Sequence, residues 1–531
     1  MSETTAGQPR TVGAAPVPPG VPEPAPAPAG APASAGESAS AGESASAVES
    51  GSAVESGSAV ESGSAVESAS AVESASAVEP EPAGEPARAR LGRPRRWYAG
   101  LAAICLIGLG IRLFYLFHWL HPVAVQGDPF YYHEAANLFA DGRGWPDPYE
   151  LRLAGRYVAD AQHPPLTSLL LAVPSLLGFT SFLSHQLFSC LLGVGAIVLV
   201  ALAGRRVAGP ATGLVAGGIA AVYPGMWLND PLVMSETTGI LTCAWIILAA
   251  CRFADRRGFA EAAWLGLALA AVMLARAELA LLALVLVVPL VAMARGVAWR
   301  RRAALLAVAA TTSVAAIAPW TAYNLSRFHE PEYLSTGLGS TLAVTHCPAT
   351  YSGRDLGWWS FDCVLALPPP PEERSERDVF YRHAAYDYIR GHSDRLPTVA
   401  AARLGRTWGV YHPWQQARLD TIELRPLSLS RVGMVTLWVL EVAALGGVVV
   451  LRRRRTPLLP LLAVPITLSL ATVVVYGTTR FRAAAEPAVV LLAAVAITAA
   501  AGRLAGPVRS RAKRIPGGQP VRSESDQGYP T

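Results

Sequence analysis

The chain has 531 residues, of which 52% are hydrophobic and only 16% are charged, and its mean hydropathy is +0.33. Soluble domains carry about 25% charged residues, so this composition is inconsistent with an ordinary soluble enzyme and indicates a membrane protein. The formal net charge of +5 comes from cations that flank apolar segments, and this distribution gives no support for nucleic-acid binding. The sequence contains no P-loop, zinc-type cysteine pair or G-x-G-x-x-G fingerprint.

Residues 1–86 consist almost entirely of Pro, Ala, Ser, Gly, Val and Glu, and from Glu37 a six-residue unit of the type Ser-Ala-Val-Glu-Ser-Gly recurs. This segment has almost no side chain larger than Val to bury, so it cannot offset the entropy lost on ordering. It also lacks the early basic region and apolar core of a signal peptide. We predict a disordered, acidic tail on the cytoplasmic side.

Arginines predict the membrane topology. Five of them precede the first apolar segment, 98–120, so the N-terminus is expected inside the cell and the loop 121–165 outside. The next apolar run, 166–179, is short for a span, which needs about 20 residues, and contains Pro174. If this run lies along the outer interface, the five later cationic clusters all fall inside. These clusters are Arg205/Arg206, Arg252/Arg256/Arg257, Arg295/Arg300/Arg301/Arg302, Arg452–Arg455 and Arg503/Arg509/Arg511/Lys513/Arg514.

The predicted fold is an all-α polytopic membrane protein with about ten transmembrane helices and both termini cytoplasmic. Interfacial helices are expected on its outer face. A transmembrane module covers 97–324, a small extracytoplasmic helical cap covers 325–428, further spans cover 429–503, and 504–531 forms a disordered basic cytoplasmic tail. The expected spans are 98–120, 182–204, 211–228, 235–254, 260–277, 279–295, 303–323, 430–451, 457–476 and 485–502.

The six cysteines fall into two groups. Cys105, Cys190, Cys243 and Cys251 lie in apolar segments, where they act as small buried hydrophobic residues. Cys347 and Cys363 share the long hydrophilic loop, and an extracytoplasmic position would allow a disulfide between them. They are the candidate pair.

The predicted topology collects charged residues at the outer face. A carboxylate base beside arginines that bind anions suits transfer from a phosphate-linked donor, and an interfacial enzyme fits this placement better than an ion pathway does. The residues are Asp128 in Gly127-Asp128-Pro129-Phe130-Tyr131-Tyr132, His163 in His163-Pro164-Pro165-Leu166, Asp230 and Glu236 in the second outer loop, Arg276 after 260–277, and Arg480 and Arg482 after 457–476.

Each residue taken alone has a simpler explanation. Asp128 could cap a helix or form a turn, and His163 could be a structural interface residue. The three arginines could extend to lipid headgroups, and Glu236 could interact with a helix dipole. The functional interpretation therefore rests on the shared location of these residues.

At these positions the chain resembles the polytopic GT-C glycosyltransferases, specifically the protein O-mannosyltransferase (family 39) and aminoarabinose-transferase-like branch. The resemblance covers about 97–503 and is carried by the order and spacing of several segments. These are Gly127–Tyr132, His163–Leu166, the acidic loop ending in Glu236, Pro319-Trp320 with Asn324, and Arg480-Phe481-Arg482 with Pro487.

The resemblance implies transfer of a sugar, of mannosyl or pentosyl type, from a polyprenyl-phosphate donor to an acceptor hydroxyl with inversion. The reaction would take place at the outer face of the plasma membrane, among membrane lipids, and the acceptor would be a glycan, a lipid or a protein. Asp128 matches the family's general base, with Tyr131 and Tyr132 beside it, and Arg276, Arg480 and Arg482 would hold the leaving phosphate. His163, Asp230 and Glu236 are candidate acceptor or metal ligands, so a divalent metal ion is a candidate cofactor. His163 departs from relatives of the aminoarabinose type, which have an acidic residue and Lys there.

Two hypotheses from other classes stay open. A transporter or lipid-linked-sugar flippase would have inverted repeats and broken helices with polar groups at the midplane. The sequence shows neither, although Pro289 and the Gly-rich segment 213–218 could conceal a break. A non-catalytic assembly protein would use the acidic tail to recruit cytoplasmic partners.

Overall fold

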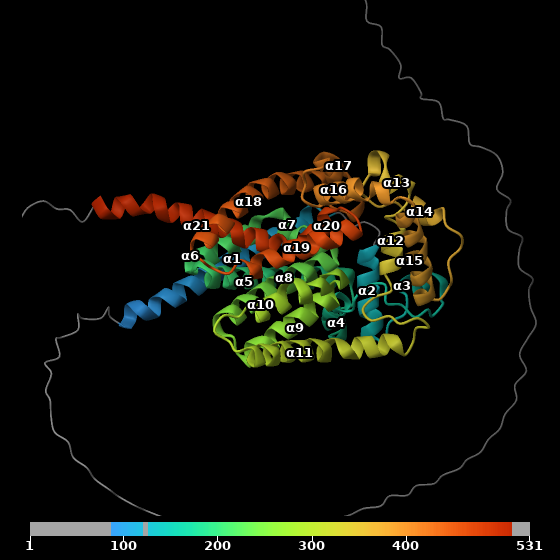
Figure 1. The fold of residues 1–531 in the computed structure, drawn as a ribbon, viewed down its shortest axis with the longest axis horizontal. Helices are drawn as coiled ribbons and strands as arrows, with labels where there is room; N and C mark the ends of the chain where they lie inside the picture. Colours follow the sequence, from blue (N-terminus) through green and yellow to red (C-terminus); the bar gives the residue numbers. More distant parts are fainter. Residues whose placement is uncertain (1–86, 121–125, 512–531) are drawn as a thin grey trace, which may run out of the picture. The chain divides into compact units, whose positions relative to one another are not determined.

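The computed structural model describes residues 87–120 and 126–511, and within them it contains helices and turns but no strand (Figure 1). The predicted tail 1–86 and residues 512–531 lie outside the described residues. The predicted all-α architecture is confirmed. The long helices are α1 (Ala87–His118), α5 (Phe182–Ala208), α6 (Pro210–Val222), α8 (Ser235–Arg256), α9 (Phe259–Ala275), α11 (Trp299–Leu325), α18 (Leu427–Arg453), α19 (Leu459–Val474) and α21 (Glu486–Arg511).

Shorter helices connect these. They are α2 (Asp128–Ala140), α3 (Pro148–Ala154), α4 (Leu166–Leu176), α7 (Pro224–Trp227), α10 (Val288–Ala292), α12 (Leu338–Ala343), α13 (Pro348–Tyr351), α14 (Asp362–Leu365), α15 (Arg374–Gly391), α16 (Leu396–Thr407), α17 (Pro413–Leu419) and α20 (Thr479–Ala483). The 3₁₀ turns are η1 (Asp230–Leu232), η2 (Ala277–Leu281), η4 (Gly353–Asp355), η5 (Ser393–Arg395) and η6 (Asp420–Glu423), and η3 (Ala283–Val287) is a π turn.

All ten predicted spans correspond to apolar helices. Six are long and apolar enough to cross a membrane: Arg95–His118, α5, α8, α11, α18 and Glu486–Arg503. A seventh is a pair bent by 75°, Pro210–Val222 with Pro224–Leu232, and the bend lies at Pro224 because proline cannot continue a helix. The three others, α9, Ala277–Ala292 and α19, are shorter than 18 residues, so their crossing of the membrane stays a prediction. Helix α4 has only 11 residues, which agrees with the expected interfacial position. Helix α21 extends to Arg511, past the predicted boundary at residue 503.

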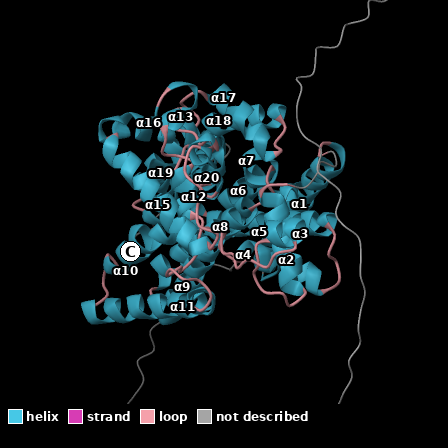
Figure 2. Ribbon diagram, turned by 90° about the vertical axis from the view of Figure 1, so that its right-hand side faces the viewer, coloured by secondary structure: helices cyan, strands magenta, loops and turns pink. Residues whose placement is uncertain are grey.

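Members of the first three predicted inner arginine clusters lie close together at one end of the helices. Arg205 lies over the Trp97 ring at 4.4 Å, and Arg206 Nε is 2.7 Å from Asp255 Oδ2. Arg257 donates a hydrogen bond to the carbonyl of Arg295. The start of α1 and the end of α21 lie toward the left in Figure 1, whereas α2, α3, α12 and α15 gather at the right. Figure 2 looks onto that second end, which carries the candidate site.

The segment 325–428 is fastened to the membrane helices by a buried arginine. Arg403 of α16 donates hydrogen bonds to the carbonyls of Val473 (2.8 Å), Val474 (3.1 Å) and Thr345 (2.7 Å). The first two bonds satisfy carbonyls that the end of α19 leaves without helical partners, and the third joins the same arginine to the cap. A disulfide joins Cys347 to Cys363 within the same segment and closes a loop of 16 positions. Together these links fix the chain that leads from α19 to α20.

Small residues allow the helices to pack closely. A Cβ atom at Gly447 of α18 would lie 2.0 Å from the backbone oxygen of Leu492 in α21, and one at Gly266 would lie 2.2 Å from the oxygen of Ala309. Close backbone approach through glycine and alanine is the usual packing of membrane helices. By contrast, a Cβ at the neighbouring Gly446 would meet the nearest atom, Ala496 Cβ, at 3.4 Å, an ordinary contact.

We therefore expect Gly447→Ala to lower the thermal unfolding temperature of the detergent-solubilised protein. Gly446→Ala is the matched control, because both changes bring the same gain in helix propensity, about 0.5–1 kcal/mol, while only the first forces α18 and α21 apart. Equal unfolding temperatures for the two variants would contradict this account of the packing.

Candidate active site

A cavity of about 540 Å³ lies where the first outer loop, the ends of α8 and α9, α20 and the 325–428 segment meet. Its ionisable lining residues come from chain segments far apart in the sequence. They are Asp128, His163, Arg276, Glu278, Glu332, Asp378, Arg382 and Arg480, and Tyr132, Ser235 and Tyr476 line it as well. The cavity is large enough for a small ligand or part of a larger one.

Local structure places Asp128 at the edge of this cavity. Gly127 has a φ of 66°, a left-handed conformation that favours glycine, and Asp128 then begins α2 with Pro129 in the first turn. A carboxylate at a helix N-terminus interacts favourably with the helix dipole. The Gly-Asp-Pro sequence therefore both turns the chain and presents the carboxylate.

Two arginines bind the carboxylates at this side of the cavity. Arg480 Nη2 is 2.5 Å from Asp128 Oδ2, its Nε donates to Glu236 Oε1 at 2.7 Å, and its Nη1 donates to Glu423 Oε1 at 2.9 Å. Arg276 Nη1 also donates to Glu236 Oε1 at 3.2 Å, and its Nε donates to Glu278 Oε1 at 2.6 Å. Two guanidinium groups thus share four carboxylates, and the cluster has an excess of negative charge.

His163 and the two tyrosines complete the surroundings of Asp128. His163 Nε2 lies 3.6 Å from Asp128 Oδ1, and its ring packs against Tyr131 and Tyr132 with centroids 4.8 and 5.0 Å apart. The Tyr131 hydroxyl donates to Asp160 Oδ2 at 2.7 Å. Tyr131 and Tyr132 therefore hold the His163 ring in place, and Tyr132 also lines the cavity.

The electrostatic setting makes Asp128 a weak base as long as Arg480 is bound to it. Burial raises the pKa of the Asp128 carboxyl, but the Arg480 charge and the His163 contact lower it more, and the net pKa lies well below its ordinary value. Nearby cations favour the charged form of a carboxyl group. Asp128 can accept a proton efficiently only after Arg480 turns to another anion.

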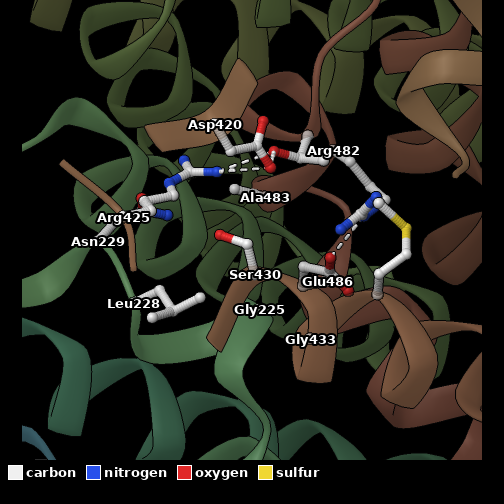
Figure 3. A pocket seen from close by; sticks show the side chains of 12 residues that line it. Gly225, Leu228, Asn229, Asp420, Arg425, Ser430, Gly433, Arg482, Ala483 and Glu486 are labelled. Atoms are coloured by element: carbon white, nitrogen blue, oxygen red, sulfur yellow. Dashed lines mark hydrogen bonds and ion pairs between the residues drawn. The ribbon is translucent and has the colours of Figure 1, made fainter. Parts of the chain in front are cut away.

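Two predicted site residues lie elsewhere. Arg482 Nε donates to Glu486 Oε1 at 2.8 Å and lines a second cavity of about 30 Å³, which Figure 3 shows. Asp420 and Arg425 form the other ion pair of that cavity (Figure 3). Asp230 Oδ2 accepts a hydrogen bond from Arg112 Nε at 2.6 Å, and both side chains are buried. Neither Arg482 nor Asp230 lines the large cavity or pairs with a residue that does. Of the five other charged residues predicted for the site, four line the cavity, and Glu236 lies behind it, bound to Arg276 and Arg480.

The predicted metal ligands do not come together. In residues 87–120 and 126–511, one group of three could hold an ion, and it consists of His329, Glu373 and Glu376 at the outside of the cap. Exposed groups of this kind are common without a metal. His163 and Glu236 are not members of such a group, and the ionic partners of Glu236 are arginines.

Sequence reasoning missed four charged residues of the site. Glu423 binds Arg480, and Glu332, Asp378 and Arg382 line the cavity. All four belong to the predicted cap, where no motif distinguishes them from other polar residues.

Residues 162–323 match the family model described as dolichyl-phosphate-mannose-protein mannosyltransferase. The predicted resemblance to the GT-C glycosyltransferases is confirmed. The matched segment includes His163, Glu236 and Arg276 of this GT-C-like chain, whereas Asp128 and Arg480 lie outside it. No curated protein matches the chain.

Among solved structures, the oligosaccharyltransferase of Archaeoglobus fulgidus, in a complex with Zn and sulfate, is 15% identical with a TM-score of 0.48, over 77% of this chain and 50% of that one. AglB from the same organism, with an inhibitory peptide and a dolichol-phosphate, is 17% identical with a TM-score of 0.48, over 81% and 53%. ArnT from Cupriavidus metallidurans, bound to undecaprenyl phosphate, is 17% identical with a TM-score of 0.36, over 79% and 81%. The chain thus spans about half the length of the archaeal enzyme.

The buried pair Arg112–Asp230 gives a test of the structural role of Asp230. Asp230→Ala leaves the Arg112 guanidinium buried without its partner and should destabilise the protein by about 3–5 kcal/mol. Arg112→Met in the same chain should restore much of the stability, since neither charge is then left alone. Thermal unfolding of the single and double variants measures both effects, and an unchanged single variant would contradict the assignment.

Proposed function

We propose that the protein is an inverting glycosyltransferase that moves a sugar from a polyprenyl-phosphate donor to an acceptor hydroxyl. The observation that carries the proposal is the meeting of Asp128 with Arg480 and Arg276 around one cavity. A carboxylate for the acceptor proton and guanidinium groups for the leaving phosphate are what this reaction requires. The family model names dolichyl-phosphate mannose, so mannose on a polyprenyl phosphate is the first donor to test.

The reaction would proceed by exchange of partners at Arg480. The donor phosphate competes with Asp128 for the guanidinium, and Asp128 then loses the cation that lowers its pKa. The acceptor oxygen attacks the anomeric carbon on the face opposite the phosphate, and its proton passes to Asp128. The bond from the anomeric carbon to the phosphate oxygen breaks, and the electron pair stays on the phosphate, which Arg480 and Arg276 bind.

We further propose that the site faces outward across the plasma membrane, with both termini in the cytoplasm. The support is that the arginine clusters and the cavity lie at opposite ends of the molecule. The arginine clusters around Arg205, Arg257 and Arg295 lie at one end, and the Asp128 cavity lies at the other. Cationic segments are retained in the cytoplasm during insertion.

Asp128→Asn should reduce the transfer rate about 10²–10⁴-fold, because the amide cannot take the acceptor proton. The measurement is the transfer of labelled mannose from its polyprenyl phosphate to acceptors in membranes that contain the full chain. Donor binding should persist, since the change removes a carboxylate and not a guanidinium.

The Asp128→Asn variant also distinguishes glycosyl transfer from the second candidate function, which is lipid flipping. The bent pair α6–α7 and the buried Arg112–Asp230 pair are features that a flippase could also have. A flippase would move labelled polyprenyl phosphate across reconstituted vesicles with or without Asp128 and would form no glycosylated product. Full transfer activity in Asp128→Asn would refute the role given to Asp128.

Arg480→Gln should weaken binding of polyprenyl phosphate about 10–100-fold, which corresponds to the loss of charged hydrogen bonds worth about 1.5–3 kcal/mol. The matched control is Arg482→Gln combined with Glu486→Gln, which removes a neighbouring arginine outside the cavity without leaving a buried charge unpaired. Binding is measured with labelled lipid on the solubilised protein. Equal weakening of lipid binding in both variants would contradict the assignment of phosphate binding to Arg480 and not to Arg482.

A further inference from the structure

A second group of charged residues lines the cavity from the side of the cap. Glu332 comes from the loop after α11, and Asp378 and Arg382 lie one turn apart on α15. Arg382 Nε is 2.7 Å from Asp378 Oδ2, whereas Arg382 Nη2 is 3.8 Å from Glu332 Oε1. The guanidinium is therefore paired with Asp378, and Glu332 is left with a distant cation.

Glu332 is a buried carboxyl group with an open bonding position. The residue is only 6% exposed, yet its Oε1 has no hydrogen-bond partner. A buried carboxylate without partners is costly, so such a group either binds a ligand or keeps its proton. Glu332 also lines the cavity, so its carboxyl group lies at the wall that a ligand there would contact.

The neighbouring charges favour the protonated form. Burial is the largest effect and Asp378 the next, and they raise the pKa of Glu332 to about 8. Glu373 and Glu330 act in the same direction, and Arg382 opposes them. At neutral pH the side chain is mainly a carboxylic acid, which offers one O–H donor and one carbonyl acceptor.

We propose that Glu332, with Asp378 and Arg382, forms an acceptor subsite that recognises an uncharged, hydroxyl-bearing group such as a sugar or a hydroxyl amino-acid side chain. The inference rests on the proposed transfer function. A neutral acid can both donate to and accept from a hydroxyl group, and the hydroxyl-bearing residues Ser340 and Thr341 line the same cavity.

Charge separates this subsite from the phosphate-binding side. On the cap side, the Arg382 guanidinium is already paired with Asp378 and Glu332 is uncharged, so no free cation is left there for an anionic ligand. Arg276 and Arg480 lie among the residues that line the cavity with Asp128, and they are the groups that a phosphate would seek. A single cavity thus offers a side for the anionic donor and a side for a neutral acceptor.

The test compares Glu332→Gln with Glu332→Ala. Glutamine copies the donor and acceptor of the protonated acid, so transfer from polyprenyl-phosphate mannose at pH 7 should stay within about threefold of the unmodified protein. Alanine removes both groups and should reduce transfer about tenfold or more, with donor binding unchanged. Glu330→Gln, an exposed neighbour, is the control and should leave transfer at pH 7 nearly unchanged, because its charge is the smallest of the effects named for Glu332.

The pH dependence adds a second readout. In the unmodified protein, ionisation of Glu332 removes its O–H donor, so transfer should decline as pH rises through about 8. Glu332→Gln has no proton to lose and should not show this decline. Infrared difference spectra of the full chain should contain a carboxylic-acid carbonyl band that titrates in the same range and is absent from Glu332→Gln.

The outcomes are distinguishable. Unchanged transfer in Glu332→Ala would overturn the subsite alone. Transfer as low in Glu332→Gln as in Glu332→Ala would also overturn it, since a cationic acceptor or a base role would then be required. Absence of transfer by the unmodified protein from any lipid-linked donor would overturn the proposed function together with the subsite.

Discussion

The guanidinium of Arg480 is the interaction on which the site depends. It binds Asp128 of α2, Glu236 of α8 and Glu423 of η6, so three segments that are distant in the sequence meet at one cation. Without it, these carboxylates would repel one another in a partly buried cluster. Charge pairing with Arg480 thus sets the geometry around Asp128. The helices bring the paired residues within reach of one another.

The excess of carboxylates in this cluster has a functional consequence. An anionic phosphate cannot bind Arg480 without displacing a carboxylate, and the displaced group becomes more basic because it loses its cation. In the proposed reaction, donor binding and activation of Asp128 are therefore coupled through one side chain. The proposed acceptor subsite at Glu332 completes this arrangement, since its guanidinium is already paired with Asp378 and leaves the anionic donor to the other side of the cavity.

The framework that holds these groups relies on small residues and buried hydrogen bonds. Gly447 and Gly266 allow helix backbones to touch, which fixes the distances between their ends. Arg403 binds the carbonyls at the end of α19, and the Cys347–Cys363 disulfide closes the adjoining loop of the cap. The backbone of the short chain from α19 to Arg480 is consequently held in place, whereas the Arg480 guanidinium at the end of its side chain can exchange one anionic partner for another.

The sequence by itself determined the helical architecture, because long apolar runs in a chain with so few charges have no other stable arrangement in a membrane. It also determined that Asp128, His163, Glu236, Arg276 and Arg480 share one end, since the arginine clusters set the direction of each helix.

Only the tertiary structure decided which of the charged residues act together. Arg482 follows Arg480 by two positions on a short helix, so the two point to different sides and bind different carboxylates. Asp230 pairs with Arg112, 118 positions earlier, and Glu332 enters the cavity from a loop without a motif. Pairing between distant charges depends on how the helices pack, and no local pattern in the sequence encodes it.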